Sequence, residues 1–175
     1  NRYAHATAEA ISKAPGTQYN PYFIYGGVGL GKTHLMHAIG NAICEGRARA
    51  RVIYITAEQF VNEYINSIRQ NNPDDFRAKY RNLDCLFMDD VQFLIGRDRS
   101  EQEFFHTFNC LFAAQKQIVM TSDRSPREMS PSEQRLISRM ESGVVADIPP
   151  PDLAPRLAII RQKGEMIKFD LPDDV

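Results

Sequence analysis

One short segment of this 175-residue chain carries residue types that bind phosphate. Residues 26–33 read Gly-Gly-Val-Gly-Leu-Gly-Lys-Thr and match the pattern G-x-x-x-x-G-K-[ST] in full. Glycines at these positions let successive backbone N–H groups turn toward one point, where they can hold a polyphosphate. Lys32 supplies a positive charge for the β- and γ-phosphates, and Thr33 supplies a hydroxyl for Mg²⁺. The expected phosphate ligands are Gly26, Gly27, Val28, Gly29, Leu30, Gly31, Lys32, Thr33 and the adjoining His34.

The segments on either side have the character that such a loop requires. The apolar run 22–25 predicts a buried strand before it, and apolar residues at helical spacing over 33–44 predict a helix after it. Strand, glycine loop and helix in this order favour a nucleotide site over a glycine-rich turn with an incidental Lys-Thr pair.

A second predicted strand ends in two carboxylates. Residues 85–88 are apolar and run directly into Asp89 and Asp90. Behind a phosphate loop, one acid at this place holds Mg²⁺, directly or through water, and a neighbouring acid can orient or deprotonate the attacking water. We therefore assign Asp89 to the metal together with Thr33, and Asp90 to water activation. The alternative is a solvated acidic turn.

A third predicted strand, 117–121, also ends in polar residues. Ser122 or Asp123 at its tip could sense or position the γ-phosphate, although both residue types also cap turns. The helix that we expect to begin at Ser130 carries Arg135 and Arg139 four residues apart, on one face. If that face meets a neighbouring subunit, a guanidinium could reach the neighbour's γ-phosphate. Two solvated arginines are the alternative.

Extra helical sequence, 57–80, follows the second strand pattern. Phe60, Tyr64 and Ile68 form an apolar line, with Val61 and Ile65 beside it. Such a line with basic residues around it could track a single DNA strand, and a core stripe with solvated charges explains it equally well. The basic residues concerned are Arg69, Arg77, Lys79, Arg81, Arg97 and Arg99.

Composition bounds the class of protein. The net charge of −1 gives no global attraction to nucleic acid, so any DNA contact must come from a local patch. No apolar stretch is long enough to span a bilayer. The three cysteines lie in apolar runs without metal-like spacing and read as reduced, buried thiols of a cytoplasmic protein. His34 and His37 have no third ligand nearby, so no further metal site is expected.

Apolar runs alternate with helical patterns along the chain. Five such runs end at turn residues or charges, which predicts an α/β fold with a parallel sheet between helices. Capping boxes at Thr56 and Ser100 and a Ser-Pro start at Ser130 mark expected helix beginnings. Pro149-Pro150-Pro151 predicts a boundary between an α/β core, 1–150, and the beginning of a helical lid, 151–175, whose first helix is capped by Asp152 and runs roughly to Lys168.

Together these residues resemble the AAA+ domain of the DnaA family of bacterial replication initiators. The resemblance extends over nearly the whole chain. The stretches that carry it are Tyr19-Asn20-Pro21, residues 24–35, residues 89–93, residues 102–109 and Thr121-Ser122-Asp123-Arg124.

The resemblance implies a sheet of order 5-1-4-3-2, an ATP/ADP and Mg²⁺ site with slow hydrolysis as an off-switch, and a homo-oligomeric helical filament that opens origin DNA. It identifies Arg139 with the arginine finger, Arg135 with the same subunit interface, and Asp123 with the first sensor. It places Ile65 and Arg99 on single-stranded origin DNA. The replicative helicase or its loader, and regulatory proteins, are the implied protein partners.

Three parts of the family pattern fall outside this sequence: the lid's sensor arginine, the duplex-reading domain and most upstream residues of the adenine pocket. The sequence is therefore expected to be a fragment. One alternative is a related helicase loader or regulatory paralogue that acts through a protein partner. A second alternative is a small-molecule kinase with a phosphate loop. The Ser122-Asp123 strand tip and the Arg135/Arg139 helix fit a self-assembling ATPase better than such a kinase.

Overall fold

A computed structural model describes residues 2–129 and 134–166, without the side chains of residues 154, 155 and 162. Five parallel strands form one sheet in the order β2-β3-β4-β1-β5, which confirms the order implied by the resemblance. Each strand begins and ends within one residue of its predicted apolar run, and these runs are 22–25, 52–55, 85–88, 117–121 and 144–148. The strands are β1 (Tyr22–Tyr25), β2 (Val52–Thr56), β3 (Cys85–Asp89), β4 (Gln117–Ser122) and β5 (Val144–Asp147).

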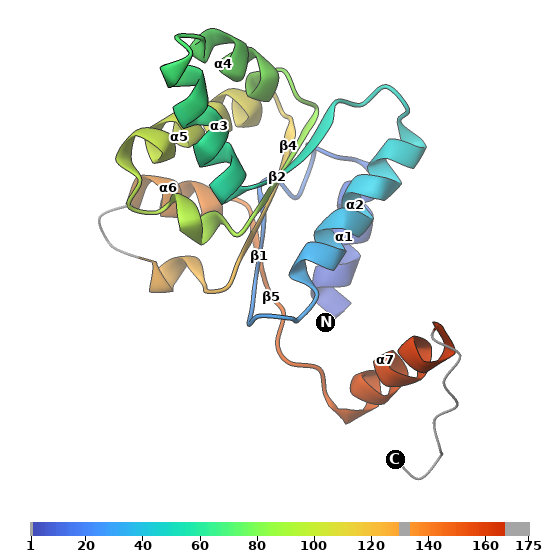
Figure 1. Ribbon diagram of the computed structural model, residues 1–175. Coiled ribbons are helices and arrows are strands. Elements are labelled where there is room, and N and C mark those ends of the chain that lie inside the picture. Colours follow the sequence, from blue (N-terminus) through green and yellow to red (C-terminus); the bar gives the residue numbers. More distant parts are fainter. Residues whose placement is uncertain (1, 130–133, 167–175) are drawn as a thin grey trace.

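Helices cover both faces of the sheet (Figure 1). Helices α1 and α2 cover one face of the sheet, and helices α3, α4, α5 and α6 cover the other. Two 3₁₀ turns, η1 (Val91–Leu94) and η2 (Pro126–Glu128), follow β3 and β4. The α-helices are α1 (Arg2–Lys13), α2 (Lys32–Gly46), α3 (Ala57–Arg69), α4 (Pro73–Arg81), α5 (Asp98–Ala113), α6 (Gln134–Glu141) and α7 (Leu153–Met166).

The strands are apolar throughout because both of their faces are buried. Tyr22 and Ile24 of β1 pack with α1 and α2, whereas Phe23 between them packs with the helices of the opposite face. β3 divides in the same way, with Phe87 on the first side and Leu86 on the second. Covered parallel strands lose the polar alternation of half-exposed strands, which is why the sequence shows continuous apolar runs.

The predicted helix beginnings have different outcomes. At Thr56 the capping box is confirmed, because its hydroxyl accepts from the Gln59 N–H at 3.2 Å and its own N–H donates to the Gln59 side chain at 3.3 Å. The capping box at Ser100 is wrong, since α5 begins at Asp98 and Ser100 is buried within its first turn. The side chain of Glu103 cannot fold back on Ser100 because it binds arginines of α4 instead. The beginning expected at Ser130 lies outside the described residues.

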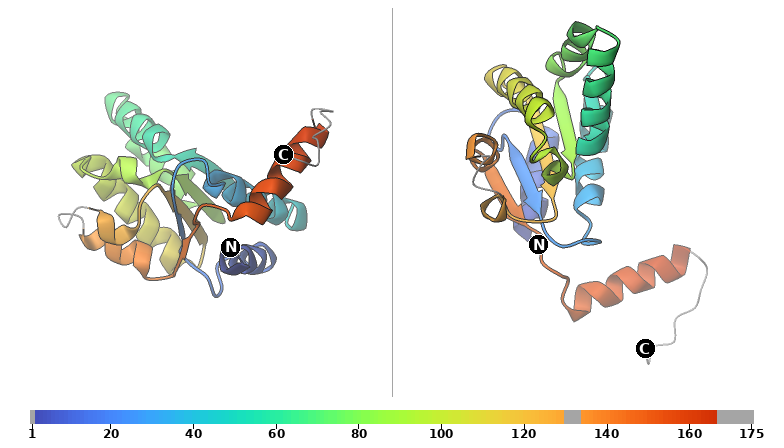
Figure 2. Two further views of the ribbon diagram at one scale, coloured as in Figure 1. Left: turned by 90° about the horizontal axis from the view of Figure 1, so that it is seen from below. Right: turned by 60° about the vertical axis from the view of Figure 1, so that its left-hand side comes forward.

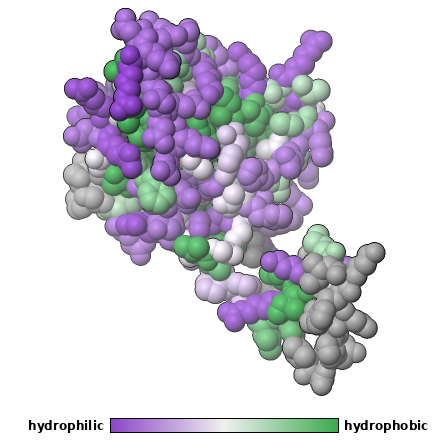
Figure 3. Space-filling model, in the orientation of Figure 1, coloured by the Kyte–Doolittle hydropathy of each residue, from purple (hydrophilic) through white to green (hydrophobic). Residues whose placement is uncertain are grey.

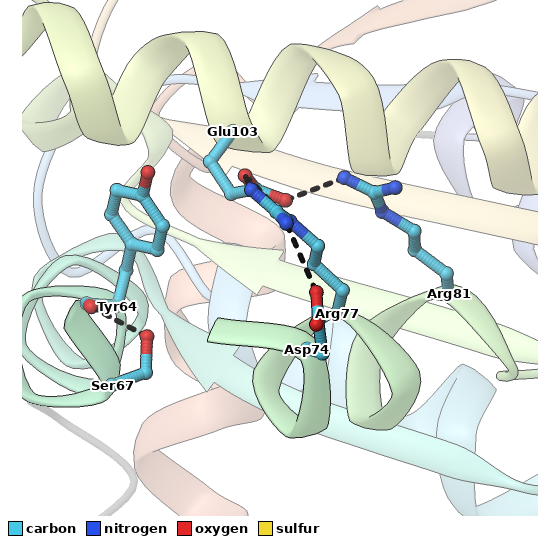
Figure 4. Close-up of polar contacts among 6 residues, drawn as sticks. All are labelled: Tyr64, Ser67, Asp74, Arg77, Arg81 and Glu103. Atoms are coloured by element: carbon cyan, nitrogen blue, oxygen red, sulfur yellow. Dashed lines mark hydrogen bonds and ion pairs between the residues drawn. The ribbon is translucent and has the colours of Figure 1, made fainter. Parts of the chain in front are cut away.

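Glu103 joins α5 to α4 (Figure 4). Its buried carboxylate accepts from the Arg81 guanidinium at 2.6 Å and from Arg77 at 3.4 Å, and Arg77 also pairs with Asp74 at 3.1 Å. Lys79 binds Glu63 of α3 at 2.7 Å. Three members of the predicted basic rim around 57–80 are therefore paired within the fold.

The cysteines are free, as predicted, but only one of them is buried. Burial raises the pKa of Cys85 to about 11, whereas Cys44 and Cys110 are exposed because they lie on the outer sides of α2 and α5. Among the described residues, no helix is long and apolar enough to cross a membrane.

After β5 the chain leaves the sheet through Pro149-Pro150-Pro151 and enters α7 one residue beyond Asp152, as predicted. α7 lies apart from the two helical layers (Figure 2). Its apolar side chains are largely uncovered, including Leu153 at 73% and Ile160 at 48% exposed, and green patches mark this helix in Figure 3.

Candidate nucleotide and metal site

The glycine loop connects β1 to α2 at the carboxyl end of the sheet. Gly26 has φ of 151°, and a Cβ there would lie 2.4 Å from the carbonyl oxygen of Ile148, so the strand end admits only glycine. Gly31 adopts a left-handed φ of 89° directly before α2 and provides no side-chain cap. The first N–H groups of α2 are thus left for an anion at the helix N-terminus.

Lys32 points back over this loop. Its side chain is buried, and its ammonium donates to the carbonyl oxygens of Gly26 and Gly27, each at 2.8 Å. These bonds hold the charge beside the loop amides. Lys32 therefore lies against the glycine loop, and its contact with phosphate stays a prediction.

Asp89 lies at the end of β3, 4% exposed, and faces hydroxyl groups from three neighbouring elements. Thr33 of α2 donates to its Oδ2 at 2.9 Å, and the hydroxyl of Tyr54 on β2 donates to the same oxygen. Thr121 of β4 donates to Oδ1. The predicted pair of Thr33 and Asp89 is thus in direct contact.

Asp90 follows Asp89 in a left-handed conformation with φ of 53°. Its N–H donates to Oγ1 of Thr121 at 3.1 Å, and its carboxylate accepts from Gln92 at 3.3 Å. One hydroxyl, that of Thr121, therefore touches both acidic residues. The turn brings the second acid to the same edge of the sheet as the first.

Two residues of this site were not predicted. In sequence, Tyr54 resembles a core aromatic of a strand, and Thr121 resembles the last apolar-facing position of another. The parallel register that pairs Met88 with Met120 carries the only signal, because it sets Thr121 beside Asp89. Burial, foremost, and then the bond to Asp89 raise the pKa of the Tyr54 phenol far above its ordinary value.

Asp123 stands beyond the end of β4, half-buried. Its carboxylate pairs with the guanidinium of Arg124 at 3.0 Å, and the hydroxyl of the buried Ser122 accepts from the Arg124 N–H at 3.2 Å. Within the described part of the chain, the polar group of this strand that contacts the acidic pair is Thr121.

An open, mainly apolar groove of about 1040 Å³ runs between α1 and α2 and reaches the glycine loop. Leu30 and His34 line its end at the loop, Ala4 and Ala8 line its α1 side, and Ile148 and Ile159 lie at its rim. No pattern in the sequence singled out α1 as a wall of this groove.

The other predicted functional residues lie on the opposite face of the sheet. Ile65 of α3 is 39% exposed and Arg99 near the start of α5 is exposed, whereas Phe60 and Val61 are core residues. Arg135 of α6 is exposed. Arg139 is half-buried, with its guanidinium carbon 6.0 Å from the centre of the Phe105 ring.

His34 and His37 form no metal cluster. Among the described residues no group of three or more His, Cys, Asp or Glu side chains could hold a metal ion. His37 instead stacks on the ring of Tyr54, with ring centres 4.1 Å apart.

The sheet order, the glycine loop and the acid at the end of β3 define a P-loop NTPase of the AAA+ class. The family model described as the bacterial DnaA ATPase domain matches residues 1–147, and the chain belongs to this family. Domain III of the replication initiation protein DnaA from Thermotoga maritima is 46% identical, with a TM-score of 0.94 over 100% of this chain and 73% of that one.

A second solved structure is a replication initiator DnaA bound to AMPPCP and single-stranded DNA. It is 39% identical, with a TM-score of 0.91 over 99% of this chain, which spans about half of that relative's length (54%). The DnaC helicase loader, at 17% identity and a TM-score of 0.65 over 82% of this chain and 86% of that one, shares the fold alone.

Proposed function

We propose that this chain is the ATP-controlled switch domain of a bacterial replication initiator. It binds ATP, assembles on origin DNA and promotes duplex opening, and slow hydrolysis to ADP resets it. The observation that carries this proposal is the contact between Thr33 of the glycine loop and Asp89 of β3. That contact joins the phosphate-binding helix to an acid in the arrangement that an ATPase requires.

The residues of the site fit Mg²⁺. The hydroxyl of Thr33 and the carboxylate of Asp89 are hard oxygen donors, which this ion prefers, and no thiol or imidazole competes with them in the described contacts of Asp89. When bound, Mg²⁺ neutralises charge that develops on the phosphate oxygens. Thr33 and Asp89 would hold it, directly or through water.

Each remaining polar group has a proposed role. The loop amides of residues 26–33 and the Lys32 ammonium hold the phosphates, with His34 at the adjoining turn of α2. Asp90 orients or deprotonates the attacking water, and Asp123 senses the γ-phosphate. The apolar groove between α1 and α2 is the place for the base, because it opens directly onto the loop.

Single-stranded origin DNA is proposed to bind on the α3 and α5 face. Ile65 offers an exposed apolar side chain. Arg99 is exposed and, unlike Arg77 and Arg81, does not pair with Glu103. Support comes from the 39%-identical relative, which is described as bound to single-stranded DNA. This face is separate from the nucleotide groove, so DNA and ATP can be held together.

Assembly into a helical homo-oligomer is proposed to use α6. Arg135 is exposed and Arg139 reaches the surface beside Phe105, on the side of the sheet away from α2. An arginine so placed can serve a neighbouring subunit's phosphate more readily than its own. The replicative helicase, its loader and regulatory proteins are further proposed partners in the cytoplasm.

The chain divides, in this proposal, into an α/β core over 1–150 and the beginning of a helical lid over 151–175. The uncovered apolar side chains of α7 support this division. A role as helicase loader gains no specific support, because the loader shares only the fold.

The DNA-binding part is tested with a labelled oligo(dT) strand and fluorescence anisotropy. We expect tighter binding in ATP than in ADP. Arg99→Ala should weaken binding and reduce the slope of log affinity against log salt by about 0.7, the value for one lost phosphate contact on a single strand. Arg49→Ala, an exposed arginine of the turn before β2, is the matched control and should leave the slope unchanged.

Equal slopes for Arg99→Ala and the wild type would remove Arg99 from the DNA contact. Equal affinity in ATP and ADP would contradict the switch itself.

A further inference from the structure

Tyr54 reaches the carboxylate that we assign to the metal, although it belongs to neither the glycine loop nor β3. Its hydroxyl donates to Oδ2 of Asp89 from the edge strand of the sheet. Thr33 donates to the same oxygen from α2 at 2.9 Å. One carboxylate oxygen is therefore held between the phosphate-binding helix and the edge strand.

The Tyr54 ring is itself fixed by α2. The imidazole of His37 stacks on it, with ring centres 4.1 Å apart and an angle of 28° between the planes. Tyr54 as a residue is 37% exposed, so core packing alone does not fix the plane of its ring. His37 and Thr33 are four residues apart on α2 and share a face, so the same helix orients both donors to Asp89.

Thr33 and Tyr54, the two donors to Oδ2 of Asp89, have different additional roles. In the proposed function the oxygen of Thr33 would hold the metal, while its hydroxyl hydrogen is donated to Asp89. Among the described residues, the Tyr54 hydroxyl has no hydrogen-bond partner other than Asp89, so its contribution is to orient the carboxylate. Groups that hydrogen-bond a ligating carboxylate fix its orientation, and their removal typically weakens metal affinity by about 10–100-fold.

We propose that Tyr54 is a positioning residue that fixes the carboxylate plane of Asp89 for the metal of the nucleotide site. This inference rests on the proposed function. It goes beyond the ligand pair of Thr33 and Asp89 by assigning a role to the edge strand β2 and, through the ring stack, to His37.

The test is a magnesium titration of ATP binding, followed with a fluorescent ATP analogue on the chain as it stands. Tyr54→Phe keeps the ring and its stack and removes only the hydroxyl. We expect the magnesium concentration at half-maximal binding to rise about tenfold. Affinity in the presence of EDTA should stay at the wild-type value, because a merely structural defect would lower affinity with and without the metal alike.

Tyr80→Phe is the matched control. Its hydroxyl donates to the carboxylate of Glu63 at 2.7 Å on the other helical layer, so the same chemical change is made away from the loop. We expect a lower melting temperature and an unchanged magnesium midpoint. His37→Leu is the second variant, because it keeps the hydroxyl and removes the stacked ring; it should raise the midpoint by a smaller factor.

A wild-type midpoint in Tyr54→Phe overturns the inference and leaves the proposed function standing. If Tyr54→Phe does not fold, His37→Leu decides, and an unchanged midpoint there overturns the inference too. No ATP binding by the wild-type chain at any magnesium concentration overturns the proposed function and the inference with it.

Discussion

At the residue scale, one buried hydroxyl group, that of Thr121, contacts both members of the acidic pair. Thr121 is fully buried, donates to Asp89 and accepts from the N–H of Asp90. A buried carboxylate oxygen or a buried N–H that is left without a hydrogen-bond partner lowers the stability of the folded state. Thr121 therefore contributes to stability and to the geometry of the site through one atom.

We expect Thr121→Val to destabilise the chain by about 1–3 kcal/mol, because it leaves one carboxylate oxygen and one N–H unpaired. Urea unfolding measures this free energy. Thr107→Val is the matched control: Thr107 is also fully buried, but within the described residues its hydroxyl has no hydrogen-bond partner, so its loss should be neutral or slightly stabilising. Equal losses in the two variants would contradict the role given to Thr121.

The same residues show which parts of the site could be predicted from the sequence. Lys32, Thr33 and Asp89 could be singled out from the sequence because a local pattern contains them, and their roles toward phosphate and metal stay predictions. Thr121 and Tyr54 could not, since each meets Asp89 only through strand pairing across the sheet. The γ-phosphate role of Asp123 stays a prediction.

At the element scale, local signals predicted strands and helices more reliably than their side-chain contacts. Apolar runs that end at turn residues or charges place all five strands, but the order of the strands came from the family resemblance, because spacing alone does not fix which strands pair. The capping box at Ser100 failed for a tertiary reason: Glu103 is drawn to Arg77 and Arg81 of α4 (Figure 4).

Asp84 ties the beginnings of three strands together at the end of the sheet away from the loop. Asp84 directly precedes β3, Arg51 precedes β2 and Lys116 precedes β4. The Asp84 carboxylate accepts from the Arg51 N–H at 2.9 Å and from the Lys116 ammonium at 2.8 Å. The Arg51 N–H foremost, and then Lys116, hold the pKa of Asp84 below its ordinary value. The ionised form is thus favoured in the folded state.

This lowered pKa predicts a specific acid sensitivity. The stabilisation is complete above the unfolded-state pKa of about 3.9 and is lost as the pH falls through the lower folded-state value. Asp84→Asn should therefore be less stable than the wild type near pH 7, and the difference in urea-unfolding free energy should shrink below about pH 4. Asp74→Asn, at a side chain that is 89% exposed, should keep the wild-type pH profile. A constant gap between Asp84→Asn and the wild type at all pH values would contradict this account.

At the scale of the whole molecule, the sheet separates two surfaces. The glycine loop, α1 and α2 lie on one side, and α3, α5 and α6 with their arginines lie on the other (Figure 1). The sheet thus lies between Arg139 and the groove of its own chain. A nucleotide on one face and an arginine on the other suit a chain of subunits in which each completes the site of the next.

Complementation between two inactive variants tests this arrangement. Lys32→Ala removes the phosphate charge and keeps Arg139, whereas Arg139→Ala keeps the loop and removes the arginine. Each alone should lose about two orders of magnitude or more in ATP turnover. Mixed on single-stranded DNA, they should recover part of the wild-type rate, because an intact loop then meets an intact arginine across some subunit contacts. Arg49→Ala, exposed and remote from α6, should turn over like the wild type. If the mixture stays as inactive as its components, Arg139 acts within its own chain or not at all, and the separation of the two faces has no catalytic meaning.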